Sequence, residues 1–235
     1  YKKHYKLKDS TSPSLQAIFD QGNEIGVLAQ SLFPSGVDAS PSSHFRMMES
    51  VIKTKAFLES GESIIYEATF NYNEVLAALD ILVKDKDGWK AYEVKSSTSV
   101  SETYIKDAAI QYYTIVNSGI DLVDISVVHI NNQYVLDGDL DINQLFTIES
   151  VKDRVLDYLP EISSNVSRLK KVIELDSAPN IDIGFHCNEP YDCDFKGTCW
   201  KHIPEYSVFD ISNLNKKKKF DLYNRGITTL DQVNL

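Results

Sequence analysis

Three charged residues in the middle of the sequence have types and a spacing that suit metal-dependent hydrolysis. Asp80 interrupts the apolar run "VLAALDILV", and Glu93 and Lys95 follow in "KAYEVKSST". A carboxylate among residues that favour burial is costly unless it is paired or bound to a cation. Alternation along a strand puts Glu93 and Lys95 on one face and points Val94 to the other. If the two runs form neighbouring strands, the three charged side chains can converge on one point.

Such a group would have a defined chemistry. The carboxylates of Asp80 and Glu93, with the main-chain carbonyl of Val94, form an oxygen-rich ligand set suited to Mg²⁺ or Mn²⁺. Lys95 beside that cation could orient or help deprotonate water and offset charge on a phosphate. Taken alone, Glu93 and Lys95 are more simply an exposed ion pair, and Asp80 is equally well a strand-end residue bonded to a turn. The three together favour the metal site.

The pattern of apolar and turn residues predicts the elements that would hold this group. A helical stripe covers residues 13–33, and a second helix is expected over about 44–59. Three strands follow, "SIIYEATFNY", "EVLAALDILVK" and "GWKAYEVKSS", and the connections "NYNE" and "KDKDG" indicate an antiparallel meander. Next come a helix, "SETYIKDAAIQYYTIVNSG", a buried strand, "LVDISVVHI", a short partner strand, "YVL", and a long amphipathic helix near 148–172. This order predicts an α/β core in which a helical crossover joins the meander to the last strand.

Composition limits the classes of protein to which the chain can belong. An apolar share of 43% in 235 residues predicts a globular core, and no apolar run is long enough to span a membrane. The net charge of −10 argues against a surface that binds nucleic acid everywhere but allows a locally basic cleft. The run from Lys216 to Lys219 is the candidate phosphate contact, with a solvated helix face as an equal alternative. Because the sequence starts without Met or a signal peptide, we expect a cytoplasmic fragment of a longer protein.

The spacing of Asp80 and the Glu93-Val94-Lys95 triplet, on the second and third strands of an αβββαβ order, resembles the PD-(D/E)xK nuclease superfamily. More narrowly, it is similar to the RecB-type branch. The resemblance implies a restriction-endonuclease-like α/β core, with a mixed sheet flanked by helices and a helical, cysteine-containing C-terminal appendage. It also implies Asp80, Glu93 and the carbonyl of Val94 as ligands of Mg²⁺ or Mn²⁺, and Lys95 as the catalytic lysine.

Two further marks of this branch can be compared with the sequence. Gln111 in "AAIQYYTIV" matches the Gln of a Q-x-x-x-Y motif, although Ile115 stands where the Tyr would be. The resemblance implies an active-site or DNA-contacting role for Gln111, and an ordinary polar helix residue is the alternative. In the first helix, Gly26 stands where the branch often has a metal-binding His. Glu24, in the same helix, is the substitute ligand that we expect, and Glu67 on the first strand is a candidate for an outer position.

The cysteines form a separate cluster in the sequence. Cys187, Cys193 and Cys199 have five residues between each pair, which differs from the C-x2-C pairs of a zinc ribbon. The segment resembles that of RecB-type nucleases in which three C-terminal cysteines and one N-terminal cysteine hold a [4Fe–4S] cluster. The resemblance implies a cofactor site here, with its fourth ligand absent from this sequence. Three free structural thiols are the alternative.

These observations combine into one prediction of organisation and function. We expect a nuclease core over residues 1–180, a cysteine-rich cluster segment over 181–205 and the start of a helix-hairpin-helix-like element over 206–235. The expected activity is that of a Mg²⁺- or Mn²⁺-dependent (exo)deoxyribonuclease in DNA repair, recombination or defence. An RNase on the same core and a non-catalytic nucleic-acid-binding module are the alternatives. DNA is the expected partner, RNA stays open, and a larger polypeptide or repair complex is the expected setting.

Overall fold

The computed structural model describes residues 13–233 of the chain, and these residues form two compact units. The sheet unit runs to Lys170 and contains every strand of the sheet, and the C-terminal unit starts at Lys171. None of the helices in the described residues has both the length and the apolar character that a membrane span requires.

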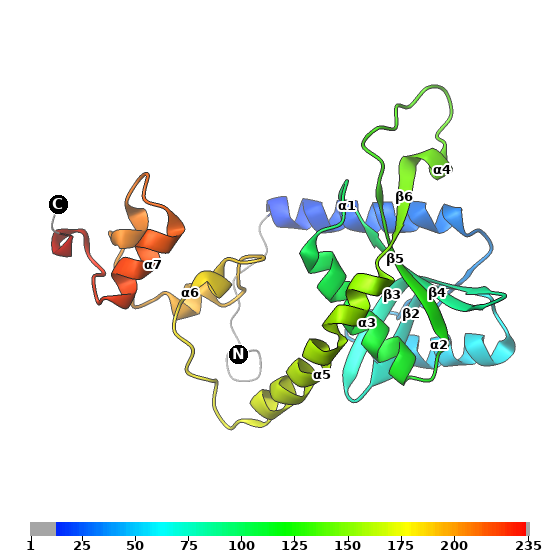
Figure 1. Ribbon diagram of the computed structural model, residues 1–235, viewed down its shortest axis with the longest axis horizontal. Helices are drawn as coiled ribbons and strands as arrows, with labels where there is room; N and C mark the ends of the chain where they lie inside the picture. Colours follow the sequence, from blue (N-terminus) through cyan, green and yellow to red (C-terminus); the bar gives the residue numbers. More distant parts are fainter. Residues whose placement is uncertain (1–12, 234–235) are drawn as a thin grey trace. The chain divides into compact units, whose positions relative to one another are not determined.

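The sheet unit is built on a mixed sheet of six strands in the order β1-β2-β3-β4-β5-β6 (Figure 1). The strands are β1 (Val37–Asp38), β2 (Ile64–Tyr72), β3 (Val75–Asp85), β4 (Gly88–Lys95), β5 (Leu122–Ile130) and β6 (Phe146–Ser150). β2, β3 and β4 form an antiparallel meander, and β4 pairs in parallel with β5. The helix α3 (Glu102–Asn117) is the crossover that this parallel pair requires. The αβββαβ order and the α/β fold class predicted from the sequence are therefore confirmed.

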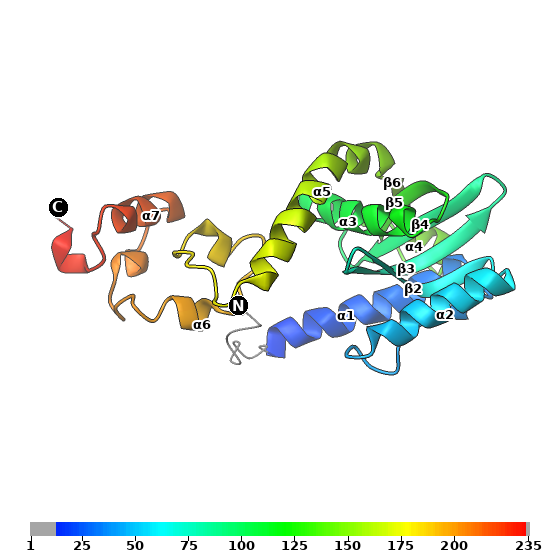
Figure 2. The same cartoon turned by 90° about the horizontal axis from the view of Figure 1, so that it is seen from below.

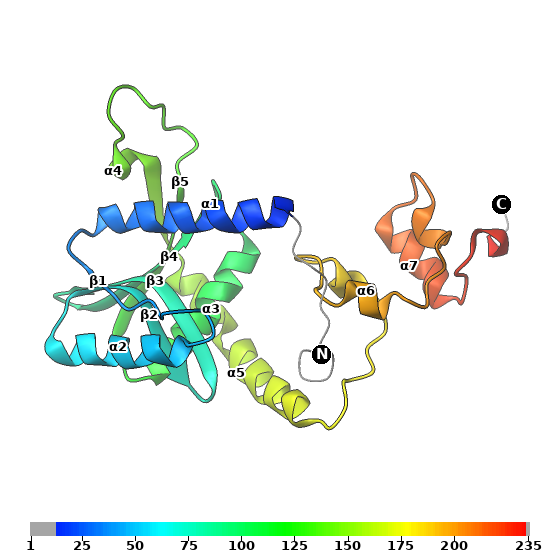
Figure 3. The same cartoon turned by 180° about the vertical axis from the view of Figure 1, so that it is seen from behind.

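Helices cover both faces of the sheet. α3 and α5 (Lys152–Glu174) lie in front of the strands in Figure 1, and α1 (Pro13–Ala29) lies in front in the opposite view of Figure 3. Figure 2 shows α1 and α3 on either side of β3 and β4. The remaining long helix, α2 (Met47–Ser60), packs against β2 and ends at Gly61, whose left-handed φ of 84° suits a helix C-terminus.

Apolar residues of the strands form two core clusters. The larger cluster joins the strands to α2, α3 and α5 and includes Ile65, Leu82, Ala91, Ile105 and Val155. The smaller cluster joins the sheet to α1 and includes Ala29, Tyr66, Ile81 and Val128. Successive residues of β4 alternate between them, since Ala91 packs in the larger cluster and Tyr92 and Val94 pack in the smaller one. This alternation turns Glu93 toward the face that α3 covers.

The prediction of a short partner strand at "YVL" is wrong. Residues 134–136 lie outside any strand, and Val135 and Leu136 are 79% and 62% exposed. The strand that pairs with β5 in the antiparallel direction is β6, which occupies the start of the segment expected to be helical, so α5 begins only at Lys152. The connection from β5 to β6 contains Gly138 and ends in the short helix α4 (Ile142–Leu145), which Asp141 caps directly before β6.

The C-terminal unit is a small assembly of short helices around aromatic residues. Its helices are α6 (Lys196–Cys199) and α7 (Lys216–Asn224), with 3₁₀ turns at Phe185–Cys187, Val208–Asp210 and Leu230–Gln232. Its core contains Ile183, Cys187 and Phe220, with Cys199, Trp200, Ile203, Phe209 and Tyr223 packed against them. Within the lysine run, Lys216 pairs with Glu189 at 2.8 Å and Lys219 donates to the carbonyl of Phe209 at 2.6 Å. Two of the four lysines thus have internal partners.

Candidate active site

The strands β3 and β4 separate where the predicted acidic residues lie. Their antiparallel pairing runs from Asp85 and Gly88 to Ile81 and Tyr92, and it ends there. The next residue of β3 is Asp80, whose Oδ2 accepts a hydrogen bond from the backbone N–H of Val94 at 2.6 Å. A side-chain carboxylate therefore takes a backbone N–H of β4 at the point where the ladder stops. The register also brings Asp80 next to Glu93.

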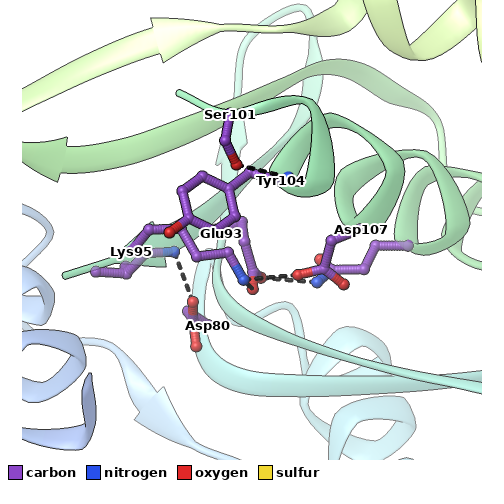
Figure 4. Close-up of polar contacts among 8 residues, drawn as sticks. Asp80, Glu93, Lys95, Ser101, Tyr104 and Asp107 are labelled. Atoms are coloured by element: carbon purple, nitrogen blue, oxygen red, sulfur yellow. Dashed lines mark hydrogen bonds and ion pairs between the residues drawn. The ribbon is translucent and has the colours of Figure 1, made fainter. Parts of the chain in front are cut away.

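Glu93 is the centre of the polar contacts shown in Figure 4. Its side chain is buried, and its Oε1 accepts from Lys95 Nζ at 2.7 Å. Its Oε2 accepts from the Nε2 of Gln111, on α3, at 2.8 Å. Asp80, Glu93, Lys95 and Gln111, which the sequence places on three separate segments, are thus brought to one end of the sheet.

The charges of the two acidic residues are only partly compensated by Lys95. Burial raises the pKa of Glu93 to about 8, and the nearby carboxylate of Asp80 adds to the effect. Burial also raises the pKa of Asp80 to about 6, with the Glu67 carboxylate adding to it, although the hydrogen bond from Val94 acts in the opposite direction. Carboxyl groups normally titrate near pH 4. Two buried carboxyls with raised pKa values are arranged to accept a proton or a cation.

Lys95 is the one basic side chain in direct contact with this pair among the described residues. Burial alone would lower its pKa, but the charges of Glu93 and Asp107 outweigh burial and raise it. Asp107 Oδ2 lies 2.6 Å from Lys95 Nζ. The lysine is therefore held as an ammonium ion.

Asp107 was missed by sequence reasoning. It lies on α3 one turn before Gln111, so the two side chains share a helix face. The signal was present in "DAAIQ", where an acid and an amide are four residues apart, but it becomes informative only when the face that α3 turns toward β4 is known. The same face includes Tyr104, whose ring centroid is 5.4 Å from Lys95 Nζ.

Glu67 faces the same region from β2. It has a φ of 55°, rare for a residue other than glycine, and the pairing of β2 with β3 omits Glu67 and Asp80. Its carbonyl accepts hydrogen bonds from the hydroxyls of Ser50, at 3.1 Å, and Thr69, at 3.2 Å. Burial raises the pKa of Glu67, and the charges of Asp38 and Glu93 raise it further. The outer position expected for Glu67 is thus near the site, at an irregular point of the strand.

Glu24 is not brought to this group. Its side chain is exposed on α1, and the helix packs against the face of β4 that carries Tyr92 and Val94. Glu93 points to the opposite face, where Gln111 binds it. We therefore leave Glu24 out of the proposed ligand set.

The cysteines do not form the expected cluster site. All three are free thiols; Cys187 is buried in the core of the C-terminal unit, and Cys193 and Cys199 are half-buried. Within residues 13–233, no three His, Cys, Asp or Glu side chains gather in a way that could hold a metal ion. The iron–sulfur site expected at Cys187, Cys193 and Cys199 is therefore not supported. The aromatic core around Cys187 agrees with structural thiols.

The group around Asp80 and Glu93 fits a divalent cation on its own chemistry. Such a site would use two carboxylates and one main-chain oxygen, and so has fewer than the three His, Cys, Asp or Glu side chains of the groups considered above. The donors are hard oxygens of the kind that Mg²⁺ and Mn²⁺ prefer. Gln111 supplies an independent observation, because its amide lies against Glu93 while its own Oε1 is buried without a hydrogen-bond partner. A buried polar atom in this state is usually satisfied by a ligand, an ion or water.

Comparison with known proteins gives little further information. No family model matches the chain, and no curated protein is similar to it. Among solved structures, the chain is similar to an alkaline exonuclease (LHK-Exo) from Laribacter hongkongensis, with 15% identity, 70% of this chain and 87% of that chain covered, and a TM-score of 0.25. The same enzyme in complex with dAMP gives 16% identity over the same shares, also with a TM-score of 0.25. Similarity this low does not carry a functional argument, which rests instead on the site.

Proposed function

We propose that this chain is a metal-dependent nuclease of the PD-(D/E)xK type that hydrolyses DNA phosphodiester bonds. The observation that carries the proposal is the convergence of Asp80, Glu93, Lys95 and Gln111 where β3 and β4 separate. Two carboxylates with raised pKa values beside an ammonium group form a site that suits a divalent cation and a phosphate better than a static ion pair.

The carboxylates have the first role in this proposal. Asp80 and Glu93, with the carbonyl of Val94, would hold Mg²⁺ or Mn²⁺. A bound cation of this kind supplies a more acidic water and neutralises charge on the phosphate. Gln111 keeps the Glu93 carboxylate in place through its 2.8 Å hydrogen bond, and the backbone N–H of Val94 does the same for Asp80.

Lys95 has the second role. Because the neighbouring carboxylates raise its pKa, we assign it the part of a cation that stabilises negative charge developing on the phosphate oxygens, rather than that of a base. A preorganised charge in a partly buried site is worth more than the same charge in water. Its side chain is 20% exposed, so Lys95 is only partly buried.

The test is cleavage of end-labelled DNA in the presence of Mn²⁺ or Mg²⁺, with a matched RNA strand as the second substrate. We expect Lys95→Ala to lower the rate by about 10³-fold, the size of effect seen when a preorganised charge-stabilising group is removed, without loss of fold by circular dichroism. Lys90→Ala is the matched control, because Lys90 lies on the same strand in an exposed pair with Asp85. Undiminished cation-dependent cleavage by Lys95→Ala would overturn the assignment. Cleavage of the RNA strand alone would replace DNA by RNA as the substrate.

A further inference from the structure

The candidate catalytic lysine contacts two carboxylates that come from different elements. Lys95 Nζ lies 2.7 Å from Glu93 Oε1, on its own strand, and 2.6 Å from Asp107 Oδ2, on α3. The ring of Tyr104 lies beside the same ammonium group, with its centroid at 5.4 Å. Three groups therefore surround the end of the Lys95 side chain (Figure 4).

The position of Asp107 follows from the register of α3. Ser101 caps the helix by accepting from the backbone N–H of Tyr104 at 3.4 Å. From that start, Tyr104, Asp107 and Gln111 follow at spacings of three and four residues, which places them on one face of the helix. That face lies over Glu93 and Lys95, because Gln111 contacts the first and Asp107 contacts the second. These two contacts place that face of α3 against the site end of β4.

The proposed function gives different roles to the two carboxylates that contact Lys95. Glu93 is an expected cation ligand, and a divalent cation bound there would compete with the ammonium group for the same negative charge. Asp107 is outside the expected ligand set, and its side chain is 40% exposed. Only Asp107 can therefore pair with Lys95 without giving up a role at the cation.

We propose that Asp107 is a positioning residue that holds the Lys95 ammonium group in the active site when a divalent cation engages Glu93. The proposal rests on the proposed function, since it assumes that Glu93 binds a cation. It assigns α3 a second task beyond the Gln111 contact. Without Asp107, the flexible stem of the lysine would be free to leave once its pairing with Glu93 weakens.

The first test measures the exposure of individual lysines and needs no catalysis. The wild-type chain and Asp107→Asn are treated briefly with acetic anhydride, with and without Mn²⁺, and acetylation of each lysine is read by mass spectrometry. In Asp107→Asn we expect Lys95 to be acetylated about tenfold faster than in the wild type when Mn²⁺ is present, the change that loss of one charge-assisted hydrogen bond can produce. Without Mn²⁺ the increase should be smaller, because Glu93 still holds the lysine.

A matched control comes from the other ion pair of β4. Lys90 Nζ lies 2.7 Å from Asp85 Oδ2 and has no part in the site. Asp85→Asn should raise acetylation of Lys90 by the same factor with and without Mn²⁺, and should leave Lys95 unchanged. The dependence on Mn²⁺ at Lys95 is what a purely structural ion pair would not show.

The second test separates positioning from binding. Asp107→Asn should lower kcat about tenfold or more, from the loss of one charge-assisted contact, while KM for DNA and the affinity for Mn²⁺ stay as in the wild type. Equal acetylation of Lys95 in Asp107→Asn and the wild type under Mn²⁺ would overturn the proposal. So would a fall in Mn²⁺ affinity as large as the fall in kcat, because Asp107 would then be a ligand. A wild-type chain that neither binds Mn²⁺ nor cleaves would overturn the proposed function instead, and the metal-free acetylation would still show whether Asp107 holds Lys95.

Discussion

The two ends of β4 carry the same kinds of charged residue in opposite electrostatic states. Near Gly88, Lys90 and Asp85 form an exposed pair at 2.7 Å, and the hydrogen bond from Lys90 lowers the pKa of Asp85. At the other end, burial raises the pKa values of Asp80 and Glu93 although Lys95 is in contact with Glu93. In the first pair, the charges of Lys90 and Asp85 offset each other. The group around Glu93 has more negative charge than Lys95 offsets.

This difference separates a surface ion pair from a functional site. An exposed pair contributes little to stability and has no need of another ion. A buried group of like charges opposes folding, and it persists where a ligand or a reaction requires it. The kinked backbone at Glu67, with its left-handed φ, lies beside the second group and not the first. Irregular backbone on β2 and excess negative charge on β3 and β4 therefore occur together in this part of the sheet.

The largest effect should come from removing the charge of Glu93. Glu93→Gln keeps the shape of the side chain, and the unpartnered Oε1 of Gln111 can turn to accept from the new amide. The fold should therefore remain, while cleavage falls by about 10³-fold because a ligand of the cation and its charge are lost. Rates with Mn²⁺ and circular dichroism measure the two effects. Wild-type cleavage by this variant would place the catalytic centre elsewhere.

A second large effect should be the pH dependence of cation binding. Ionised carboxylates bind the cation, so affinity for Mn²⁺ should rise from pH 6 to pH 8 as Glu93, with a pKa of about 8, loses its proton. Each proton released on binding changes the affinity by about tenfold per pH unit. Affinity that is flat between pH 6 and pH 8 would contradict the raised pKa.

The same shifts predict how the metal-free chain responds to pH. A carboxyl whose pKa is raised in the folded state binds its proton more tightly there than in the unfolded chain. The contribution of Glu93 to the free energy of unfolding is therefore greatest below 4.5, its pKa in the unfolded chain, and is lost as pH rises through about 8. The free energy of unfolding, measured with urea, should fall across this window and recover when Mn²⁺ is added. Asp85→Asn, at the end of β4 near Gly88, should leave this dependence of the free energy of unfolding on pH unchanged.

Much of this arrangement could be predicted from the sequence because strand geometry alone determines it. Alternation placed Glu93 and Lys95 on one face, and the short connection between β3 and β4 brought Asp80 beside them. Asp107 could not be recognised in this way, because its contact depends on the rotation of α3 about its axis. The iron–sulfur expectation is not supported, and the spacing in "HCNEPYDCDFKGTC" alone does not show where the side chains point.

A smaller effect should come from Gln111. Gln111→Ala removes the 2.8 Å hydrogen bond to Glu93 Oε2 and leaves the cation ligands in place. We expect kcat to fall about tenfold, the value of one hydrogen bond to a charged group, with Mn²⁺ affinity reduced less than kcat. Asn117→Ala, which removes a bond to the carbonyl of Tyr113 in the same helix, is the control. Equal kinetics in the two variants would make Gln111 an ordinary helix residue.

The smallest effect should come from the hydroxyl groups behind Glu67. Ser50 is buried, and it bonds to the Glu67 carbonyl and to Thr69 Oγ1, the latter at 2.7 Å. Ser50→Ala should lower the free energy of unfolding by about 1 kcal/mol and reduce cleavage a few-fold, because the irregular backbone at Glu67 loses one of its supports. Loss of stability with wild-type cleavage would show that the kink does not serve the site.

The central claim is that the end of β4 near Lys95 binds a divalent cation through Asp80 and Glu93, and calorimetric titration with Mn²⁺ tests it most directly. The wild-type chain should bind Mn²⁺ at pH 8, and Asp85→Asn should bind it equally well. Asp80→Asn keeps an acceptor for the backbone N–H of Val94, yet it should show no saturable binding at this site. Binding by Asp80→Asn as tight as that of the wild type, or no binding by the wild type, would contradict the account.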